Sequence, residues 1–402
     1  FFKQKTAYDI RLSLVGSEMC IRDRDFPMLA RLIGETIINW HQDYKLFFKR
    51  FCNDQQEIIN LYKIEPKSIM INDIASGLSD SHSGGKTVKH IYFSSGHSMI
   101  YKPKNIEIDK CYYSFSSWVN SKLNRQSLMP LKTICREDYG WVEYLAYMPI
   151  NNSSKLPEFY YNAGVFLCVA HILKITDCHY ENLIANSVQI TLIDCETVMH
   201  PQVQQSDEFI TNKFLNKSFL QSIFRTGFLP NWTTHLNNST NMDISGLGGL
   251  RYDDKNVEIL KEDRNSQYGS VKNIETKNQP LINPKANLND FIPDLILGFT
   301  DCYNAFLECK NDLLNEKLTI IKQFKNLQTR FIYRATEVYD KVIRYAMLPE
   351  NLKSGIAFSI SLDILSRSHL IENAKTDLWK LYIHENIYTS KLDIPLFHTK
   401  TT

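Results

Sequence analysis

The sequence predicts an α+β protein with more than one packed lobe, and three observations lead to this expectation. Residues 29–51 carry apolar side chains three and four positions apart over several turns, which is the spacing of an amphipathic helix. Residues 88–102 contain two strand-like runs on either side of a Gly-His turn, a pattern typical of a β-hairpin. The chain of 402 residues is long enough to bury the cores of two or three lobes.

The composition indicates an ordinary globular protein, with 43% hydrophobic and 22% charged residues. A formal net charge of +2 forces no basic face, so nucleic acid is not an expected partner. The longest apolar run, residues 164–173, is too short to span a bilayer and predicts no transmembrane segment. Nine cysteines without a CxxC pair favour reduced thiols in a cytoplasmic enzyme over a disulfide framework or a zinc cluster.

The first 24 residues need a separate explanation, because they show no helical or strand period. They contain the strings KQKTAY and LVGSEMCIRD, which resemble a translated sequencing adapter. We therefore expect residues 1–24 to be an artefact, and we expect the native N-terminus to be missing. The alternative is a genuine N-terminal arm.

Three regions are expected along the rest of the chain: a helical segment at 25–75, an N-lobe-like β-rich region at 76–150 and a C-lobe-like, mainly helical region at 151–402. The last region includes a strongly apolar helix near residues 160–174, followed by a polar loop and a short β-rich segment, QITLID. Residues 232–290 are rich in Asn, Asp, Gly and Ser, which predicts long loops. Amphipathic helices are expected at 291–350 and 360–390.

Polar side chains suited to phosphate chemistry follow the apolar helix. Asp177 precedes Asn182 in a D-x-x-x-x-N arrangement, and Asp194 follows the next short strand. In a phosphotransferase one carboxylate, here Asp177, orients or deprotonates the attacking hydroxyl. Asn182 and Asp194 would supply oxygen ligands for the Mg²⁺ that holds the phosphates of ATP. The D-x-x-x-x-N pattern alone is common by chance, and the strand that ends in Asp194 makes it more specific.

A phosphotransferase site also needs a fixed cation on the phosphates. Lys102 closes the second strand of the predicted hairpin, as the nucleotide-binding lysine of protein kinases does, and Glu143 is a candidate partner for it. Taken singly, these residues have ordinary alternatives, such as a solvated lysine on a strand or an aspartate in a turn or helix cap. Their joint order along the chain favours the kinase-type interpretation.

A second segment, Ser83 to Thr87, superficially resembles a P-loop and is rejected. A P-loop requires a glycine where this chain has Asp80, and it requires a following helix where this chain is predicted to enter strands. The segment is therefore not interpreted as a phosphate-binding loop.

Several short motifs occur in the order found in one enzyme family. In this chain they read SDSHSGGKTV, YKPK, YGWVEYL, TDCHYENLIA, LIDCETVMHP, RTGFLP and DIPLF. With these motifs, residues 25–400 resemble the dehydratase domain of class II lanthipeptide synthetases. The resemblance implies a kinase-like, two-lobed catalytic core, similar to lipid and protein kinases, with substantial helical additions.

The resemblance implies two successive reactions in one pocket. The γ-phosphate of ATP, held with Mg²⁺, passes to a Ser or Thr hydroxyl of a precursor peptide that consists of a leader and a core. The phosphate is then eliminated, which leaves dehydroalanine or dehydrobutyrine. Phosphorylation prepares the side chain because phosphate is a far better leaving group than hydroxide.

Residue roles follow from the resemblance by position in this chain. The positions that match the family's phosphorylation residues are Lys102, Asp177, His179, Asn182, Asp194 and Glu196. Asp80 and His82 match a D-x-H pair, and two further positions, Arg330 and Thr336, match a pair associated with elimination. An arginine suits a departing phosphate because it forms bidentate hydrogen bonds, and His82 is our hypothesis for the base that removes the α-proton. Without the resemblance, we would interpret His82 as a structural histidine, Arg330 as a surface arginine and Thr336 as a helix-capping threonine.

Two features depart from the family, whose full enzymes usually continue into a zinc-dependent cyclase. The chain ends soon after DIPLF and offers no Cys/His set with zinc-ligand spacing, so we expect a fragment without the cyclase domain. A cyclase on a missing C-terminal part is then a candidate partner, and the helical region before residue 25 is expected to be absent or replaced. Two alternatives stay open: a peptide or small-molecule kinase that never eliminates phosphate, and an inactive kinase-like scaffold that only binds the precursor.

Overall fold

The computed structural model describes most of the chain between residues 24 and 401. The described stretches are 24–201, 221–230, 232–234, 241–248, 276–280, 288–314, 319–367 and 378–401. All but the last residue of the adapter-like segment, and most of the predicted loop region at 232–290, lie outside them. Helices and strands are both present in these stretches, which is compatible with the predicted α+β class. None of the helices described there is long and apolar enough to cross a membrane.

Two compact units make up the chain, and both are discontinuous in sequence. Among the described residues, unit 1 takes those between 24 and 103 and between 332 and 397, and unit 2 takes those between 104 and 331 and between 398 and 401. Hydrophobic periodicity does not reveal such a division, because it reports on one segment of the chain at a time.

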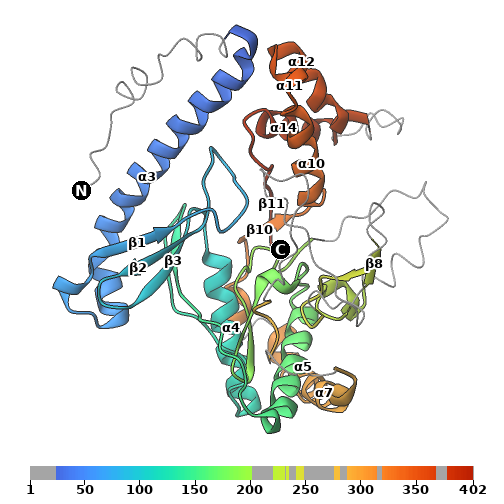
Figure 1. The fold of residues 1–402 in the computed structure, drawn as a ribbon. Helices are drawn as coiled ribbons and strands as arrows, with labels where there is room; N and C mark the ends of the chain where they lie inside the picture. Colours follow the sequence, from blue (N-terminus) through green and yellow to red (C-terminus); the bar gives the residue numbers. More distant parts are fainter. Residues whose placement is uncertain are drawn as a thin grey trace. The chain divides into compact units, whose positions relative to one another are not determined.

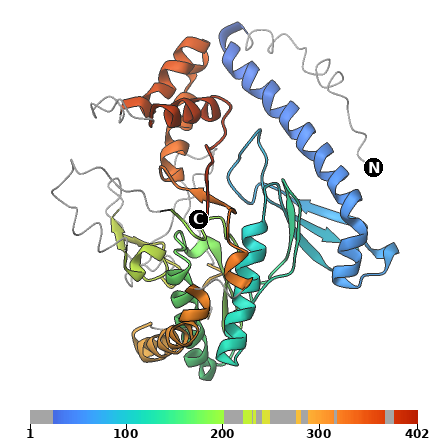
Figure 2. The same cartoon turned by 180° about the vertical axis from the view of Figure 1, so that it is seen from behind.

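Unit 1 contains one long helix, a small antiparallel sheet and a group of shorter helices (Figures 1 and 2). Its helices and strands are α3 (Pro27–Tyr62), β1 (Ile71–Ala75), β2 (Lys89–Phe93), β3 (Ser98–Lys102), α10 (Thr336–Ala346), α11 (Pro349–Leu352), α12 (Gly355–Leu362) and α14 (Leu378–Thr389). Helix α3 begins with a proline, whose fixed φ suits the first turn, and ends where Lys63 adopts a left-handed conformation. The N-terminal end of α3 packs Met28 and Leu32 into a core shared with α10, α11 and α12.

The predicted hairpin is confirmed as strands β2 and β3, which pair antiparallel with Lys89 opposite Tyr101. Strand β1 pairs with the other edge of β2. Met99 and Tyr101 are fully buried, and the ring centroid of Tyr101 lies 5.1 Å from that of Phe47 on α3. This packing fixes Lys102, the last residue of β3, within unit 1.

A buried ion pair links α3 to the sheet. Lys89 of β2 and Asp43 of α3 form a salt bridge, and their side chains are only 1% and 6% exposed. The ammonium group of Lys89 also lies 5.3 Å from the ring centroid of Tyr44 and 5.8 Å from that of Tyr101, which adds cation–π attraction. Removing one partner would leave an uncompensated charge in the interior.

Replacing Asp43 by Ala is expected to lower the free energy of unfolding by about 3–5 kcal/mol, because Lys89 then stays buried without its counter-ion. Urea unfolding followed by circular dichroism measures the loss. The double variant Asp43→Leu with Lys89→Met removes both charges and is expected to lose less stability than the single variant. Equal stability of the wild type and Asp43→Ala would show that the ion pair does not hold α3 on the sheet.

Unit 2 contains the longer helices α4, α5 and α7 together with short antiparallel hairpins. Its helices and strands are α4 (Glu107–Leu123), β4 (Thr133–Cys135), β5 (Gly140–Glu143), α5 (Leu156–Ile172), β6 (Leu183–Asn186), β7 (Gln189–Leu192), β8 (Trp232–Thr234), β9 (Asn241–Asp243), α7 (Ile292–Glu308), α8 (Lys310–Leu314), α9 (Thr319–Lys322) and β10 (Gln328–Phe331). Strand β11 (Phe397–Lys400) begins at the last residue of unit 1 and pairs with β10.

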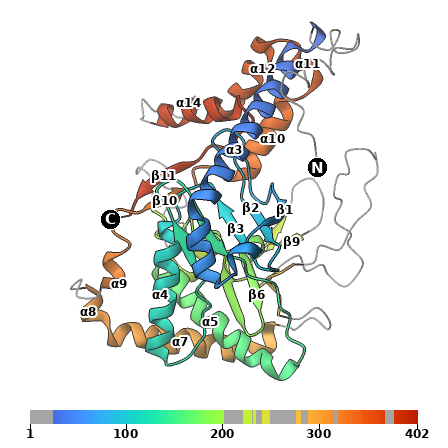
Figure 3. The same ribbon diagram turned by 90° about the vertical axis from the view of Figure 1, so that its left-hand side faces the viewer.

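Helix α5 is the buried centre of unit 2 and corresponds to the apolar helix predicted near residues 160–174. Helix α7 crosses it at close range, as Figure 3 shows, because each helix has a glycine at the crossing. A Cβ atom at Gly164 would lie 2.0 Å from the carbonyl oxygen of Leu295, and one at Gly298 would lie 1.9 Å from that of Tyr161. Neither position has room for a side chain, so the backbones of α5 and α7 can pack in direct contact at this crossing.

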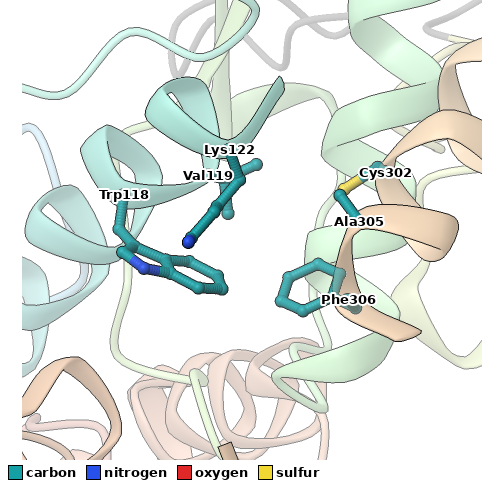
Figure 4. A pocket seen from close by; sticks show the side chains of 6 residues that line it. All are labelled: Trp118, Val119, Lys122, Cys302, Ala305 and Phe306. Atoms are coloured by element: carbon teal, nitrogen blue, oxygen red, sulfur yellow. The ribbon is translucent and has the colours of Figure 1, made fainter. Parts of the chain in front are cut away.

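A narrow gap separates α4 from α7 (Figure 4). The residues that line it are Trp118, Val119, Lys122, Cys302, Ala305 and Phe306. The gap is too narrow to hold a water molecule, and the ring centroids of Trp118 and Phe306 lie 5.8 Å apart. It is therefore a packing feature of unit 2 and not a ligand site.

Candidate functional site

The loop after α5 is held in a defined conformation by its backbone contacts. Asp177 has a φ of 64°, in the left-handed region that aspartate enters more readily than most residues. The N–H of the next residue, Cys178, donates to the carbonyl oxygen of Thr226 at 2.8 Å. On the other side, the hydroxyl of Thr197 donates to the carbonyl oxygen of Thr176 at 2.5 Å. The residues on both sides of Asp177, Thr176 and Cys178, are therefore each held by a hydrogen bond.

Three predicted residues lie together in this loop. The side-chain amide of Asn182 donates to the carbonyl oxygen of Asp177 at 2.9 Å and lies 3.4 Å from its Oδ2. Nδ1 of His179 lies 3.3 Å from Oδ1 of Asp177, and its Nε2 lies 3.3 Å from Oε2 of Glu181. The D-x-x-x-x-N spacing therefore brings Asp177, His179 and Asn182 into direct contact.

The imidazole of His179 is held between two carboxylates. Burial disfavours its charged form, but hydrogen bonds to Asp177 and Glu181 and the charge of Asp177 outweigh burial and raise the pKa of His179 to about 10. The hydrogen bond from His179 in turn lowers the pKa of Glu181. At neutral pH His179 is therefore an imidazolium that donates hydrogen bonds and does not accept a proton.

An NMR titration of the His179 ring is expected to show a proton that is lost near pH 10. Because this value lies above the ordinary histidine pKa of about 6.5, the ion pair stabilises the fold fully below about pH 6.5 and is lost as the pH rises towards 10. Asp177→Asn removes one carboxylate and is expected to lower the pKa, and His179→Gln assigns the signal. If the His179 ring of the wild type titrates at the ordinary histidine pKa, its pairing with Asp177 and Glu181 is contradicted.

Hairpin β6–β7 returns the chain to Asn182. Leu183 pairs with Leu192 at the open end of the hairpin, and the N–H of Ile193 donates to the carbonyl oxygen of Asn182 at 2.9 Å. Asp194 is the next residue, so the two oxygen ligands predicted for Mg²⁺ both lie beside the open end of this hairpin. The spacing between them is explained by local strand pairing.

These two side chains fit a magnesium ion chemically. The NH₂ group of Asn182 donates to Asp177. The side-chain oxygen of Asn182 is therefore the atom that could bind a metal ion. The side chain of Asp194 is 33% exposed, so a ligand can reach its carboxylate. Mg²⁺ prefers a small number of such oxygen ligands together with the phosphates of a substrate.

A second group of predicted residues meets at Glu196. The carboxylate of Glu196 pairs with Lys104 through one oxygen and with Arg330 through the other. Lys104 also lies 3.3 Å from Oδ1 of Asp194. The backbone joins the same segments, because the N–H of Arg330 and the hydroxyl of Thr329 donate to the carbonyl oxygen of Glu196 at 2.7 and 3.1 Å. Asp194 and Glu196 of one motif and the distant Arg330 thus belong to one cluster.

The opposite charges of this cluster stabilise one another's ionised forms. Burial disfavours the charge of Glu196, but the positive charges of Lys104 and Arg330 outweigh it and hold the pKa of Glu196 well below its usual range. Burial also opposes the charge of Lys104, whereas Asp194 and Glu196 raise the pKa of Lys104 above its usual value. In the same way, Glu196 raises the pKa of Arg330 despite burial. Glu196, Lys104 and Arg330 are therefore all charged at neutral pH.

Lys104 was not predicted as a site residue. The motif YKPK pointed to its first lysine, Lys102, because that residue closes a strand, and Lys102 is indeed the last residue of β3. The two acidic partners of Lys104 lie 90 and 92 residues further along the chain. No spacing rule detects a contact over that distance, and the only signal was the presence of a second lysine in the motif.

The remaining predicted residues belong to other elements. Glu143 ends β5, where its carboxylate accepts a backbone N–H at 3.1 Å, and its pairing with Lys102 remains a prediction. Asp80 and His82 lie in the loop between β1 and β2 of unit 1. Thr336 is the first residue of α10, also in unit 1.

The sequence of this chain matches a known protein family and is similar to a known biosynthesis protein. The sequence model of a family described as a domain of unknown function, DUF4135, matches residues 26–400. Over 336 residues the chain is 25% identical to the lacticin 481/lactococcin biosynthesis protein LcnDR2 of Lactococcus lactis subsp. lactis. The similarity covers 79% of this chain and 34% of the relative, so the chain spans about a third of that protein's length.

Proposed function

Since the chain belongs to the family described as a domain of unknown function, DUF4135, and is similar to a lacticin 481/lactococcin biosynthesis protein, we propose that it modifies a lanthipeptide precursor. The proposed modification is the ATP-dependent dehydration of Ser and Thr side chains by a kinase-like fold. The observation that carries this proposal is the placement of Asn182 and Asp194 beside the open end of hairpin β6–β7, with Asp177 in contact with Asn182. Phosphoryl transfer needs such a carboxylate together with oxygen ligands for a metal.

In the first proposed reaction, the peptide hydroxyl oxygen bonds to the γ-phosphorus of ATP while the bond from that phosphorus to ADP breaks. The proton of the hydroxyl passes to the carboxylate of Asp177, whose direction is set by its contacts with His179 and Asn182. Asn182 and Asp194 would hold Mg²⁺, which when bound neutralises charge on the phosphates. Lys102 is the proposed cation for the phosphates of ATP.

In the second proposed reaction, a base removes the α-proton and the electron pair of the Cα–H bond forms the Cα=Cβ bond. The Cβ–O bond breaks, and phosphate leaves with the electron pair of the Cβ–O bond. We assign the base to His82 and the stabilisation of the departing phosphate to Arg330, with Thr336 assisting this step. Glu196 holds one edge of the Arg330 guanidinium, and the fork of donors that an arginine carries suits the oxygens of phosphate.

Mass spectrometry of the lacticin 481 precursor peptide, incubated with the full chain, ATP and Mg²⁺, tests the proposal. The wild-type chain is expected to remove one or more waters from the peptide. Thr336→Ala is expected to accumulate phosphopeptide, because phosphoryl transfer continues while elimination slows. Thr300→Ala changes an exposed threonine of α7 and serves as the matched control that should behave as the wild type.

Stable phosphopeptide from the wild-type chain would favour a kinase that does not eliminate phosphate. A peptide that binds to the chain and yet keeps its mass would favour an inactive scaffold. Either result would contradict the proposed dehydration. Water loss by Thr336→Ala at the wild-type rate would leave the dehydration standing and remove Thr336 from the elimination step.

A further inference from the structure

One buried carboxylate of unit 1 joins two segments that are far apart in the sequence. Asp393 is 2% exposed and belongs to the DIPLF motif, which has no role in the proposed reactions. Asp393 accepts hydrogen bonds from the Ser81 hydroxyl at 2.6 Å and from the backbone N–H groups of Gly84 and Gly85 at 2.6 and 3.0 Å. The N–H of the following residue, Ile394, donates to the carbonyl oxygen of Ser81 at 2.9 Å.

The backbone conformation of the loop that contacts Asp393 directs two N–H groups at its carboxylate. Left-handed conformations follow one another at Ser83 (φ 50°), Gly84 (φ 90°) and Gly85 (φ 76°). Consecutive residues of this kind turn their N–H groups to one side, where a single anion can accept them. The loop is closed by paired hydrogen bonds between the backbones of His82 and Lys86, at 3.1 and 2.9 Å. The loop and the position of Asp393 therefore depend on each other.

The same arrangement fixes the ring of His82. Its Nδ1 lies 2.7 Å from the carbonyl oxygen of Ile394, the residue next to Asp393. A carbonyl oxygen only accepts hydrogen bonds, so Nδ1 carries the proton. In the neutral ring the lone pair then resides on Nε2, which is the atom that can accept a proton.

We propose that Asp393 is a positioning residue that acts through His82, an inference that rests on the proposed function in which His82 removes the α-proton. Asp393 holds the loop, the carbonyl oxygen of Ile394 selects the tautomer, and Nε2 of His82 becomes the proton acceptor. The DIPLF motif thereby acquires a role in the elimination step. Asp393 itself does not contact the reacting atoms in this proposal.

An aspartate is required here because three donors converge on its two oxygens. In Asp393→Asn, whichever way the amide is turned, its NH₂ group replaces one accepting oxygen and faces the N–H of Gly84 or of Gly85. A donor that faces a buried donor is unfavourable, so the loop moves away from the anchor. The hydrogen bond between His82 and Ile394 then no longer selects one tautomer.

The tautomer of His82 is measured by long-range ¹H–¹⁵N NMR of the full chain labelled with ¹⁵N-histidine, with His82→Gln to assign the signal. The wild-type neutral ring is expected to carry its proton on Nδ1, and Asp393→Asn is expected to show a mixture of both tautomers. Glu385→Gln is the matched control. Glu385 is a fully buried carboxylate of unit 1 that accepts hydrogen bonds from Arg334 and Tyr339. This control should keep the wild-type tautomer.

Elimination from a supplied Ser-phosphorylated lacticin 481 precursor peptide gives the functional readout. Asp393→Asn is expected to slow elimination about tenfold or more, while phosphoryl transfer to the unmodified peptide changes by less than about threefold. Glu385→Gln should change neither rate selectively.

The proposal is overturned by a wild-type ring protonated on Nε2, by an unchanged tautomer in Asp393→Asn, or by an equal change in Glu385→Gln. These NMR results do not depend on activity. If the wild type shows the expected tautomer but never eliminates phosphate, the proposed function fails while the positioning of His82 by Asp393 is supported.

Discussion

The candidate site depends on one shared carboxylate, that of Glu196. The side chain of Glu196 is only 13% exposed, and its charge is stabilised by two partners, Lys104 and Arg330. Since Lys104 also contacts Asp194, the same pairing joins the first segment of unit 2, the hairpin β6–β7 and strand β10. Loss of Glu196 would remove the carboxylate that pairs with Arg330 and would leave Lys104 paired with Asp194, so its effect would reach every part of the cluster.

Rigid elements place the polar loops in both units. In unit 2, the glycine crossing of α5 and α7 fixes the helix that precedes Asp177, and local pairing in the hairpin fixes Asp194. In unit 1, the buried carboxylate of Asp393 fixes the loop that bears His82. In each unit a carboxylate with little exposure to water joins segments that are far apart in the sequence, Glu196 in one and Asp393 in the other.

Local patterns predicted the parts of the structure that depend on local spacing. The amphipathic helix α3 follows from the period of its apolar residues, the hairpin β2–β3 from two strand-like runs around a turn, and the buried helix α5 from its continuous apolar run. The contact between Asp177 and Asn182 was also predictable, because they are only five positions apart in the sequence. Lys104 and Asp393 were missed because their partners lie 90 to 92 and 308 to 312 residues away. Single ion pairs and hydrogen bonds over such distances leave no period in the sequence, and Arg330 was found only through family resemblance.

Peptide-dependent formation of ADP is the most direct measurement of the proposed phosphoryl transfer. With Mg²⁺ and ATP, we expect the full chain to form ADP faster when the lacticin 481 precursor peptide is present. Asp177→Asn should lower this rate by about 10²–10⁴-fold, because the hydroxyl proton loses its acceptor. The matched control Asp301→Asn changes a carboxylate on α7 and should keep the wild-type rate. Peptide-dependent ADP formation by Asp177→Asn at the wild-type rate would contradict the assignment of this loop as the site of phosphoryl transfer.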